Sequence, residues 1–224
     1  MLAKLFAVLA YLIGLAGAGF FFAYVVGSGT GLWQRGGHGI FPAPFNLFLL
    51  LLFACQHSGM ARQTFKKRFG SLGRSIYVAT SGITLGALTG LWQELPGEPI
   101  WHGPSWIVAF SLLAALAIGC YCARFDHATF FGLRQAWTGT AGIREPLCVE
   151  GPYRYVRHPL MLGLLITLWA QPIMPRDLLM LNLGMTGYII FAIGLEERDL
   201  AREYGEEYEK YRREVPVLIP WKWW

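Results

Sequence analysis

Charged residues are scarce in this sequence, and they are unevenly distributed. Only 15% of the 224 residues are Asp, Glu, Lys or Arg, whereas 54% are hydrophobic. A soluble domain of this size carries about 25% charged residues. The few charges are gathered into short stretches between long apolar runs, which is typical of membrane-spanning helices. This distribution excludes a string of soluble domains and favours one helical bundle in a membrane.

Patterns that would bind a metal are also missing. The five histidines are scattered without an HExxH motif, and none of the four cysteines forms a CxxC pair. We therefore expect no metal site, and cysteines that pack as small hydrophobic side chains. The net charge of +5 does not indicate a nucleic-acid partner. The basic residues lie beside the ends of the apolar runs, where they meet anionic membrane lipids.

Six apolar segments each approach the roughly 20 residues needed to cross a bilayer. The fifth is short and ends at Gln171-Pro172, so we expect a tight hairpin there that does not span fully on its own. The sequence thus predicts an all-α, polytopic transmembrane bundle of about six spans. The segments are Leu5–Val26, Pro44–Met60, Ile76–Leu91, Ser105–Cys122, Leu160–Met174 and Leu178–Leu195.

Lys and Arg in the loops predict the orientation of the bundle. The stretches after the second, fourth and sixth segments are rich in both residues. By contrast, the loop 93–104 has neither, the loop 27–43 has only Arg35, and the hairpin has only Arg176. Since basic loops stay in the cytoplasm, we expect a multi-pass protein with both termini on the cytoplasmic side.

The stretch 151–159, with the sequence GPYRYVRHP, directly precedes the fifth segment. Pro159 suits the first turn of a helix, so Arg157 and His158 would lie at the helix N-terminus. Free N–H groups and the helix dipole favour an anion at that position. One interpretation is a receptor for a carboxylate or phosphate, and the other is anchoring by positive charge; the residues alone favour neither.

Glu196 and Glu197 form an acidic pair at the cytoplasmic end of the sixth segment. Acidic residues at a helix C-terminus oppose the dipole, unless the helix continues into the tail. Near a membrane such a pair needs a cationic or hydroxyl-bearing partner. A ligand amine, ribose hydroxyls or the arginines of the stretch 151–159 would each serve.

The tail Arg198–Pro216 predicts a cytoplasmic amphipathic helix. Its apolar residues recur at spacings of three and four, which places them on one face. Gly205 within this pattern costs about 1 kcal/mol against alanine, so we expect the helix to bend or to approach another element there. The apolar face, which would cap a pocket against the bilayer, consists of Leu200, Tyr204, Tyr208, Tyr211 and Val215.

Taken in order, these stretches resemble the C-terminal module of isoprenylcysteine carboxyl methyltransferases and phospholipid methyltransferases. The matching pieces are the entry GPYRYVRHP, the hairpin, the acidic pair, and a Gly-x-x-Tyr-x-x-Tyr-x-x-x-Val-Pro ending at Pro216. The resemblance implies an S-adenosylmethionine site in residues 131–224, integrated with a four-span region in residues 1–130. It also implies cofactor-binding roles for Gln135, Gly151, Tyr153, His158, Pro159, Glu196 and Glu197.

The N-terminal half is similar to nurim-like proteins and bacterial methanethiol S-methyltransferases. The similarity lies in Gln56–Arg62, Phe65-Lys66 and Arg74–Val78, and in the FGLRQ stretch that ends at Gln135. Candidate catalytic residues are Arg157 and His57, whose imidazole would take the proton of a thiol. The alternative for His57 is a structural histidine that bridges two helix ends.

This resemblance implies a methyltransferase in a bacterial inner membrane that converts methanethiol to dimethyl sulfide. One alternative is a lipidic acceptor, either an isoprenylcysteine carboxylate or a phospholipid amine. Another is a non-catalytic, nurim-like structural membrane protein.

Overall fold

The computed structural model describes residues 1–33, 39–124, 127–139 and 147–220, and these residues contain helices but no strand. The predicted all-α class is therefore confirmed. Two 3-10 turns, η1 (Gly70–Leu72) and η2 (Gly151–Arg154), lie before α4 and α8. The α-helices are α1 (Leu2–Gly29), α2 (Pro42–Ala61), α3 (Gln63–Arg68), α4 (Gly73–Gly90), α5 (Ile107–Arg124), α6 (His127–Phe130), α7 (Leu133–Thr138), α8 (Pro159–Trp169), α9 (Arg176–Tyr204) and α10 (Glu206–Glu214).

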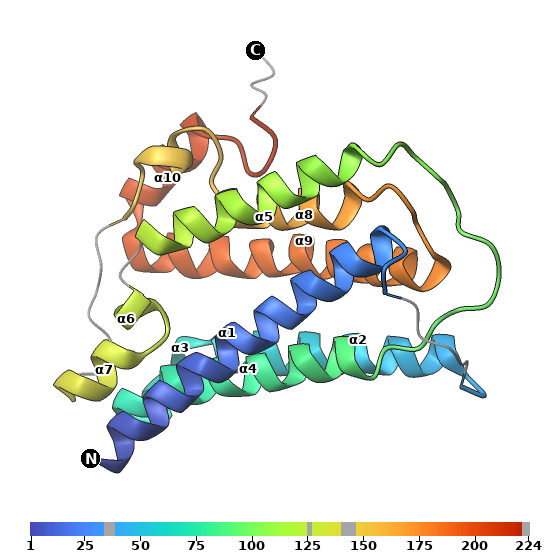
Figure 1. The fold of residues 1–224 in the computed structure, drawn as a ribbon. Coiled ribbons are helices and arrows are strands. Elements are labelled where there is room, and N and C mark those ends of the chain that lie inside the picture. Colours follow the sequence, from blue (N-terminus) through green and yellow to red (C-terminus); the bar gives the residue numbers. More distant parts are fainter. Residues whose placement is uncertain (34–38, 125–126, 140–146, 221–224) are drawn as a thin grey trace.

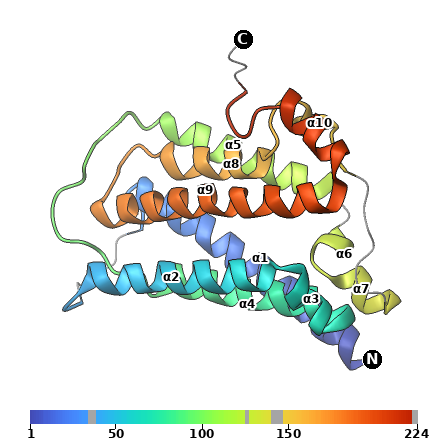
Figure 2. The same cartoon turned by 180° about the vertical axis from the view of Figure 1, so that it is seen from behind.

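The long helices form two groups. Figure 1 shows α5, α8 and α9 side by side above α2 and α4, with α1 running obliquely across both groups. The view from behind places α9 and α2 on the opposite face from α1 (Figure 2). Helix α1 packs along α4, and α2 bridges α4 and α9. Residues distant in sequence are thereby brought to the same end of the bundle.

Helices α1 and α4 approach closely because small residues meet at their crossing. Gly17 of α1 lies against the backbone of Gly82, and Gly82 lies against the backbone of Ile13 and Gly14. A Cβ atom at Gly17 or Gly82 would collide with the facing backbone. Small residues allow such close packing between helices in membranes, where hydrophobic burial gives little net attraction.

Three of the six expected spans are long and apolar enough to cross a membrane, namely α1, α2 and α9. Helices α4 and α5 each have 18 residues, and α8 is the shortest of the six. Helix α8 has 11 residues, so it rises roughly 16 Å, about half the thickness of a bilayer core. The fifth segment therefore stops short, as expected, and Leu160–Met174 is helical only to Trp169.

Side chains satisfy the carbonyl groups at the buried end of α8. Asn182 donates to the carbonyl of Leu168 at 2.6 Å, and Ser111 donates to the carbonyl of Thr167 at 3.1 Å. Gln171 donates to the same carbonyl and to the Ser111 hydroxyl. A helix can end at this depth because its last carbonyls find partners within the protein.

The outer surface carries large apolar side chains, as expected of a bundle that faces lipid. Each side chain in the following set is at least 45% exposed, and the set is drawn from four different helices. It comprises Leu5, Leu9 and Leu12 of α1, Leu47, Phe48, Leu51 and Leu52 of α2, Leu112, Leu113 and Leu116 of α5, and Leu183, Ile190 and Phe191 of α9.

Helices α3, α6, α7 and α10 gather at the end of the bundle that also holds the N-terminus (Figures 1 and 2). Helix α9 continues through the acidic pair to Tyr204, which removes the dipole cost at Glu196 and Glu197. The expected amphipathic helix Arg198–Pro216 is not continuous. Gly205, with φ +59° and ψ −129°, separates α9 from α10 at a conformation that is nearly restricted to glycine.

Candidate functional site

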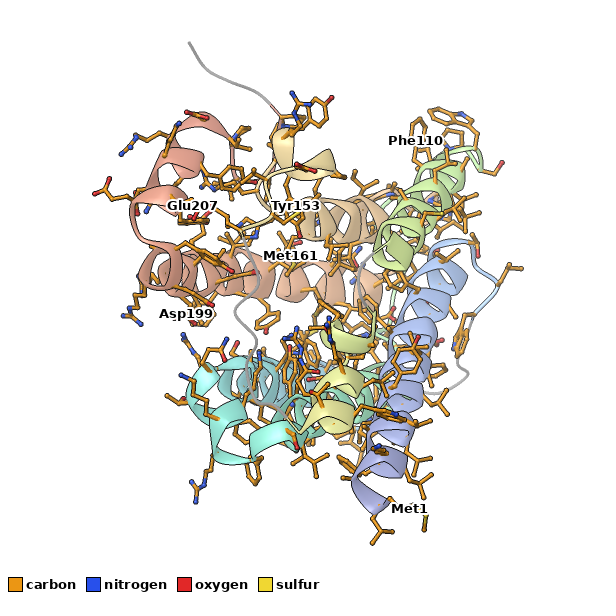
Figure 3. The ribbon with its side chains drawn as sticks, turned by 90° about the vertical axis from the view of Figure 1, so that its left-hand side faces the viewer. Met1, Phe110, Tyr153, Met161, Asp199 and Glu207 are labelled. Carbon is orange, nitrogen blue, oxygen red and sulfur yellow. The ribbon has the colours of Figure 1, made fainter. Side chains whose placement is uncertain are left out.

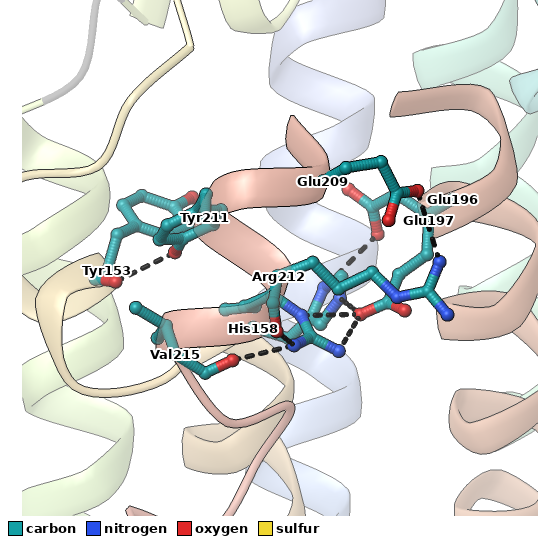
Figure 4. A network of polar contacts seen from close by, with 9 residues as sticks. Tyr153, His158, Glu196, Glu197, Glu209, Tyr211, Arg212 and Val215 are labelled. Carbon is teal, nitrogen blue, oxygen red and sulfur yellow. Dashed lines mark hydrogen bonds and ion pairs between the residues drawn. The ribbon is translucent and has the colours of Figure 1, made fainter. Parts of the chain in front are cut away.

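Acidic and basic side chains meet where α8 begins against α9 and α10 (Figure 4). The Nε and Nη2 atoms of Arg157 lie 2.8 and 2.7 Å from Oε1 of Glu197 on α9. The two side chains are 7% and 15% exposed, so the ion pair is largely removed from water. Of the partners considered for the acidic pair, Glu197 therefore has an arginine of the stretch 151–159.

Arg157 also holds the C-terminal end of α10. Its Nη1 donates to the carbonyl oxygens of Arg212 and Val215, at 2.8 and 2.6 Å, near the helix end where carbonyls lack helical partners. The backbone N–H groups of Arg157 and His158 donate to the carbonyls of the two residues that follow Val215. The basic and N–H groups before α8 are thus paired with a carboxylate and with carbonyls of the chain itself.

Glu196 differs from its neighbour because its side chain is 51% exposed. The buried His158 places Nε2 3.3 Å from Oε1 of Glu197 and Nδ1 3.6 Å from Oε2 of Glu196. The second distance is too long for a hydrogen bond. Glu197 is therefore committed to Arg157, whereas the Glu196 carboxylate remains accessible to a ligand.

Tyrosines connect α10 to this cluster. Tyr211 donates its hydroxyl to the Tyr153 carbonyl at 2.7 Å and so ties α10 to η2. Tyr208 is 1% exposed, and its hydroxyl has no hydrogen-bond partner among the described residues. Burial raises the pKa of Tyr208 and of Tyr211 to about 12, so both remain proton donors at neutral pH. A buried unsatisfied donor is costly, and a polar ligand would satisfy Tyr208.

Three further expected residues take no part in this network of contacts. Gly151 opens η2 with φ +61°, and Pro159 is the first residue of α8. Gln135 on α7 is buried and donates to the Thr129 carbonyl at 3.1 Å, while its Oε1 finds no partner among the described residues. Among the described residues, no hydrogen bond joins Gln135 to Arg157 or to the acidic pair.

His57 lies in a second cluster, between α2, α4 and α9. Its Nε2 is 2.8 Å from the Tyr77 hydroxyl, and its Nδ1 is 3.2 Å from the Ser81 hydroxyl. Phe53 and Tyr188 pack against the imidazole, with ring centroids 5.2 and 6.1 Å away. His57 therefore bridges α2 and α4, and both of its ring nitrogens contact hydroxyl groups of the chain.

Hydroxyl side chains of α4 surround Gln56, the residue before His57. Gln56 Nε2 donates to the hydroxyls of Thr80 and Ser81, and its Oε1 accepts from Thr84 at 2.7 Å. Tyr77 lies within the stretch Arg74–Val78 but has no role assigned to it there, and the motifs above do not include Ser81 or Thr84. Their spacings of four and three nevertheless place them on one helix face, and a polar stripe along an apolar segment would have indicated them.

Lys66 of α3 lies between the two clusters. Its Nζ is 5.1 Å from the centroid of the Tyr77 ring, and Glu196 interacts electrostatically with both Lys66 and Tyr77. Burial, followed by the neighbouring Arg74, lowers the pKa of Lys66 to about 8. The charged cluster and the His57 cluster are therefore linked at one end of the bundle through Glu196 and Lys66. Asp199, one turn beyond Glu196, points to the layer of α2 and α3 and binds Arg62 at 3.1 Å (Figure 3).

Comparisons with known proteins agree with one another. A family model described as NnrU protein matches residues 46–193. Methanethiol S-methyltransferase 2 of Bradyrhizobium diazoefficiens is 42% identical over 192 residues, covering 78% of this chain and 72% of that protein. Methanethiol S-methyltransferase of Mycobacterium tuberculosis is 38% identical over 190 residues, or 79% and 77% of the two chains. Nurim of Sus scrofa is 34% identical over 187 residues, or 71% and 68%. No solved structure gives a significant match.

Proposed function

This chain belongs to the NnrU protein family, together with methanethiol S-methyltransferases and nurim, and from that membership we propose that it transfers a methyl group from S-adenosylmethionine to a small thiol. Methanethiol, which would yield dimethyl sulfide, is the favoured acceptor. The observation that carries the proposal is a charged, polar cluster linked to an aromatic cluster through Glu196 and Lys66 at one end of a membrane bundle.

The charged cluster fits the polar parts of the cofactor. When bound, S-adenosylmethionine supplies a methyl group already activated on a sulfonium. The exposed Glu196 carboxylate would accept hydrogen bonds from the amine or the ribose hydroxyls, and the unsatisfied Tyr208 hydroxyl would donate one. Tyr153, His158 and Gln135 would complete the binding site. Arg157 acts through Glu197 and α10, so its geometry favours positioning of the site over direct catalysis.

The second cluster fits a small neutral acceptor. Phe53 and Tyr188 supply apolar ring surface beside His57, and the polar groups that contact His57 are hydroxyls. The nearby charge is the Lys66 ammonium, which lies over the Tyr77 ring. Methanethiol is apolar enough to reach this depth through the bilayer. A phospholipid headgroup or a prenylcysteine carboxylate would have to bring a charge next to these rings, which is costly.

The same proposal gives the protein an orientation. The end that holds both clusters also holds the basic stretches, so we place it and both termini on the cytoplasmic face of a bacterial inner membrane. Cytoplasmic S-adenosylmethionine would reach this end directly. Reporter fusions at each terminus, active only in the cytoplasm, would test the orientation.

The activity assay uses the purified chain in detergent with S-adenosylmethionine and methanethiol. We expect dimethyl sulfide in the headspace. We also expect Glu196→Gln to weaken the binding of S-adenosylhomocysteine about tenfold. Glu209→Gln is the matched control, since Glu209 lies at the surface of α10 and pairs only with Arg212 within the described residues. Cofactor binding without thiol methylation would point to a lipidic acceptor, tested with prenylcysteine and phosphatidylethanolamine. No cofactor binding would favour a structural role like that considered for nurim.

A further inference from the structure

We propose that Tyr77, backed by His57, is the group that removes the proton from the acceptor thiol. This inference rests on the proposed thiol methyltransferase activity and assigns a residue role within it. Its basis is a chain of hydrogen bonds from the Tyr77 hydroxyl to His57, Ser81 and Gln56.

His57 cannot meet the thiol directly in this arrangement. In the tautomer that carries its proton on Nδ1, the imidazole donates to Ser81 at 3.2 Å and accepts from the Tyr77 hydroxyl at 2.8 Å. Both ring nitrogens are then engaged, and Phe53 covers the ring at a centroid distance of 5.2 Å. With both ring nitrogens engaged, the Tyr77 oxygen is the group left to receive the thiol proton.

The cluster around Tyr77 is not fully enclosed by the protein. The Tyr77, His57 and Tyr188 side chains are all half-buried. The Tyr77 oxygen keeps accepting capacity while it donates to His57. It can therefore take a proton from one side as it gives its own proton to the other.

The proton step balances within this chain of groups. The thiol S–H bond breaks as its proton passes to the Tyr77 oxygen, the Tyr77 proton passes to Nε2 of His57, and the electron pair stays on sulfur. The thiolate sulfur then bonds to the methyl carbon as the bond from that carbon to the donor sulfur breaks. The positive charge lost from the donor sulfur reappears as the proton on His57, which is released to water before the next turnover.

The charges around Tyr77 favour ionisation of the thiol. Lys66 lies over the Tyr77 ring, and Arg74, Glu196 and Tyr188 are the other titratable groups that face this side chain. A thiol near cationic groups ionises more readily. The Lys66 ammonium also opposes a lasting positive charge on His57, so the proton does not remain there.

The test compares two thiols of different acidity in three variants, Tyr77→Phe, His57→Gln and Tyr188→Phe. Methanethiol must lose its proton on the enzyme, whereas thiophenol is already largely thiolate at neutral pH. We expect Tyr77→Phe and His57→Gln to lower kcat/KM about a hundredfold with methanethiol and less than tenfold with thiophenol. Tyr188→Phe, which removes a hydroxyl bonded to Ser58 in the same cluster, should affect both thiols equally.

A second readout needs no turnover. With S-adenosylhomocysteine bound, thiolate absorbance gives the pH at which bound thiophenol ionises, and Tyr77→Phe should raise that pH while Tyr188→Phe leaves it unchanged. Equal losses with both thiols, or an unchanged ionisation pH, would overturn the role of Tyr77 while leaving the methyltransferase function standing. A wild-type protein that methylates neither thiol would overturn the function itself, and this role with it.

Discussion

Replacing Arg157 with alanine should release α10 from the bundle. The change removes the ion pair with Glu197 and the two hydrogen bonds to the carbonyls of Arg212 and Val215. Removing one partner of a buried ion pair costs about 3–5 kcal/mol, because the other charge is left unpaired. The carbonyl bonds come from the same guanidinium and are not fully additive, so we take about 3–5 kcal/mol as the whole effect.

The loss should be local because α10 has nine residues and a helix that short is not stable without packing. Hydrogen–deuterium exchange of the amides in residues 206–214 measures it directly. A loss of about 3 kcal/mol predicts exchange that is roughly a hundredfold faster or more.

Arg212→Ala is the matched control for this experiment. The Arg212 side chain is 50% exposed and pairs at the surface with Glu209, which is worth about 0–1 kcal/mol. Adding Glu197→Gln to Arg157→Ala should restore part of the protection, since no unpaired carboxylate then remains. If Arg157→Ala exchanges no faster than Arg212→Ala, Arg157 does not hold α10 and the reasoning is refuted.

Three more predictions concern single residues at this end of the bundle. Tyr208→Phe removes a buried hydroxyl without a partner among the described residues, so the cofactor-free protein should melt at the same or a higher temperature. S-adenosylhomocysteine should bind about tenfold more weakly in calorimetry. A fall in both the melting temperature and the affinity would show that the hydroxyl is already satisfied. Gly205→Ala should lower the free energy of unfolding by about 1–3 kcal/mol in thermal melts, because its φ of +59° disfavours a Cβ atom. Gly194→Ala is the control: Gly194 lies within α9 with open space beside it, so the change should be neutral or slightly stabilising. Lys66 should titrate near pH 8, because burial and Arg74 lower its pKa, so its charge is present at pH 7 and lost by pH 9. NMR of the 13C-methylated amine measures the titration, and Lys66→Arg identifies the signal. A midpoint near the ordinary 10.4 would contradict this environment.

The helices could be located from the sequence because a bilayer leaves the backbone few options. A chain in lipid must satisfy its own N–H and C=O groups, so each apolar run becomes a helix. The expected segment Leu5–Val26 lies within α1, and Leu178–Leu195 lies within α9. The fifth segment ended early because Pro172 cannot donate a backbone hydrogen bond and also restricts Gln171.

The partners within the charged cluster could not be assigned in the same way. The order of the motifs placed Arg157 and the acidic pair on the same side of the membrane. It did not decide whether the carboxylates of the acidic pair bind a ligand or a group of the protein. The outcome depends on the turn at Gly205, which folds α10 back so that its carbonyls reach Arg157. Periodicity records which residues share a helix face, and it carries no information on where a helix goes after a break.

The division between charged and neutral polar groups has a consequence for the acceptor. A hydroxyl can lie deep in an apolar helix at little cost, because it bonds to the carbonyl four residues before it, as Thr80 does to Ile76 at 2.8 Å. A charge has no such local partner, and placing one at the centre of a membrane costs about 2.5–3.5 kcal/mol even on insertion scales. The charged cluster thus suits the charged cofactor proposed above, whereas the His57 cluster suits a group that arrives neutral and becomes an anion only next to Lys66. The proposed thiol acceptor would meet that requirement, whereas a carboxylate or a phospholipid headgroup would be charged before it enters.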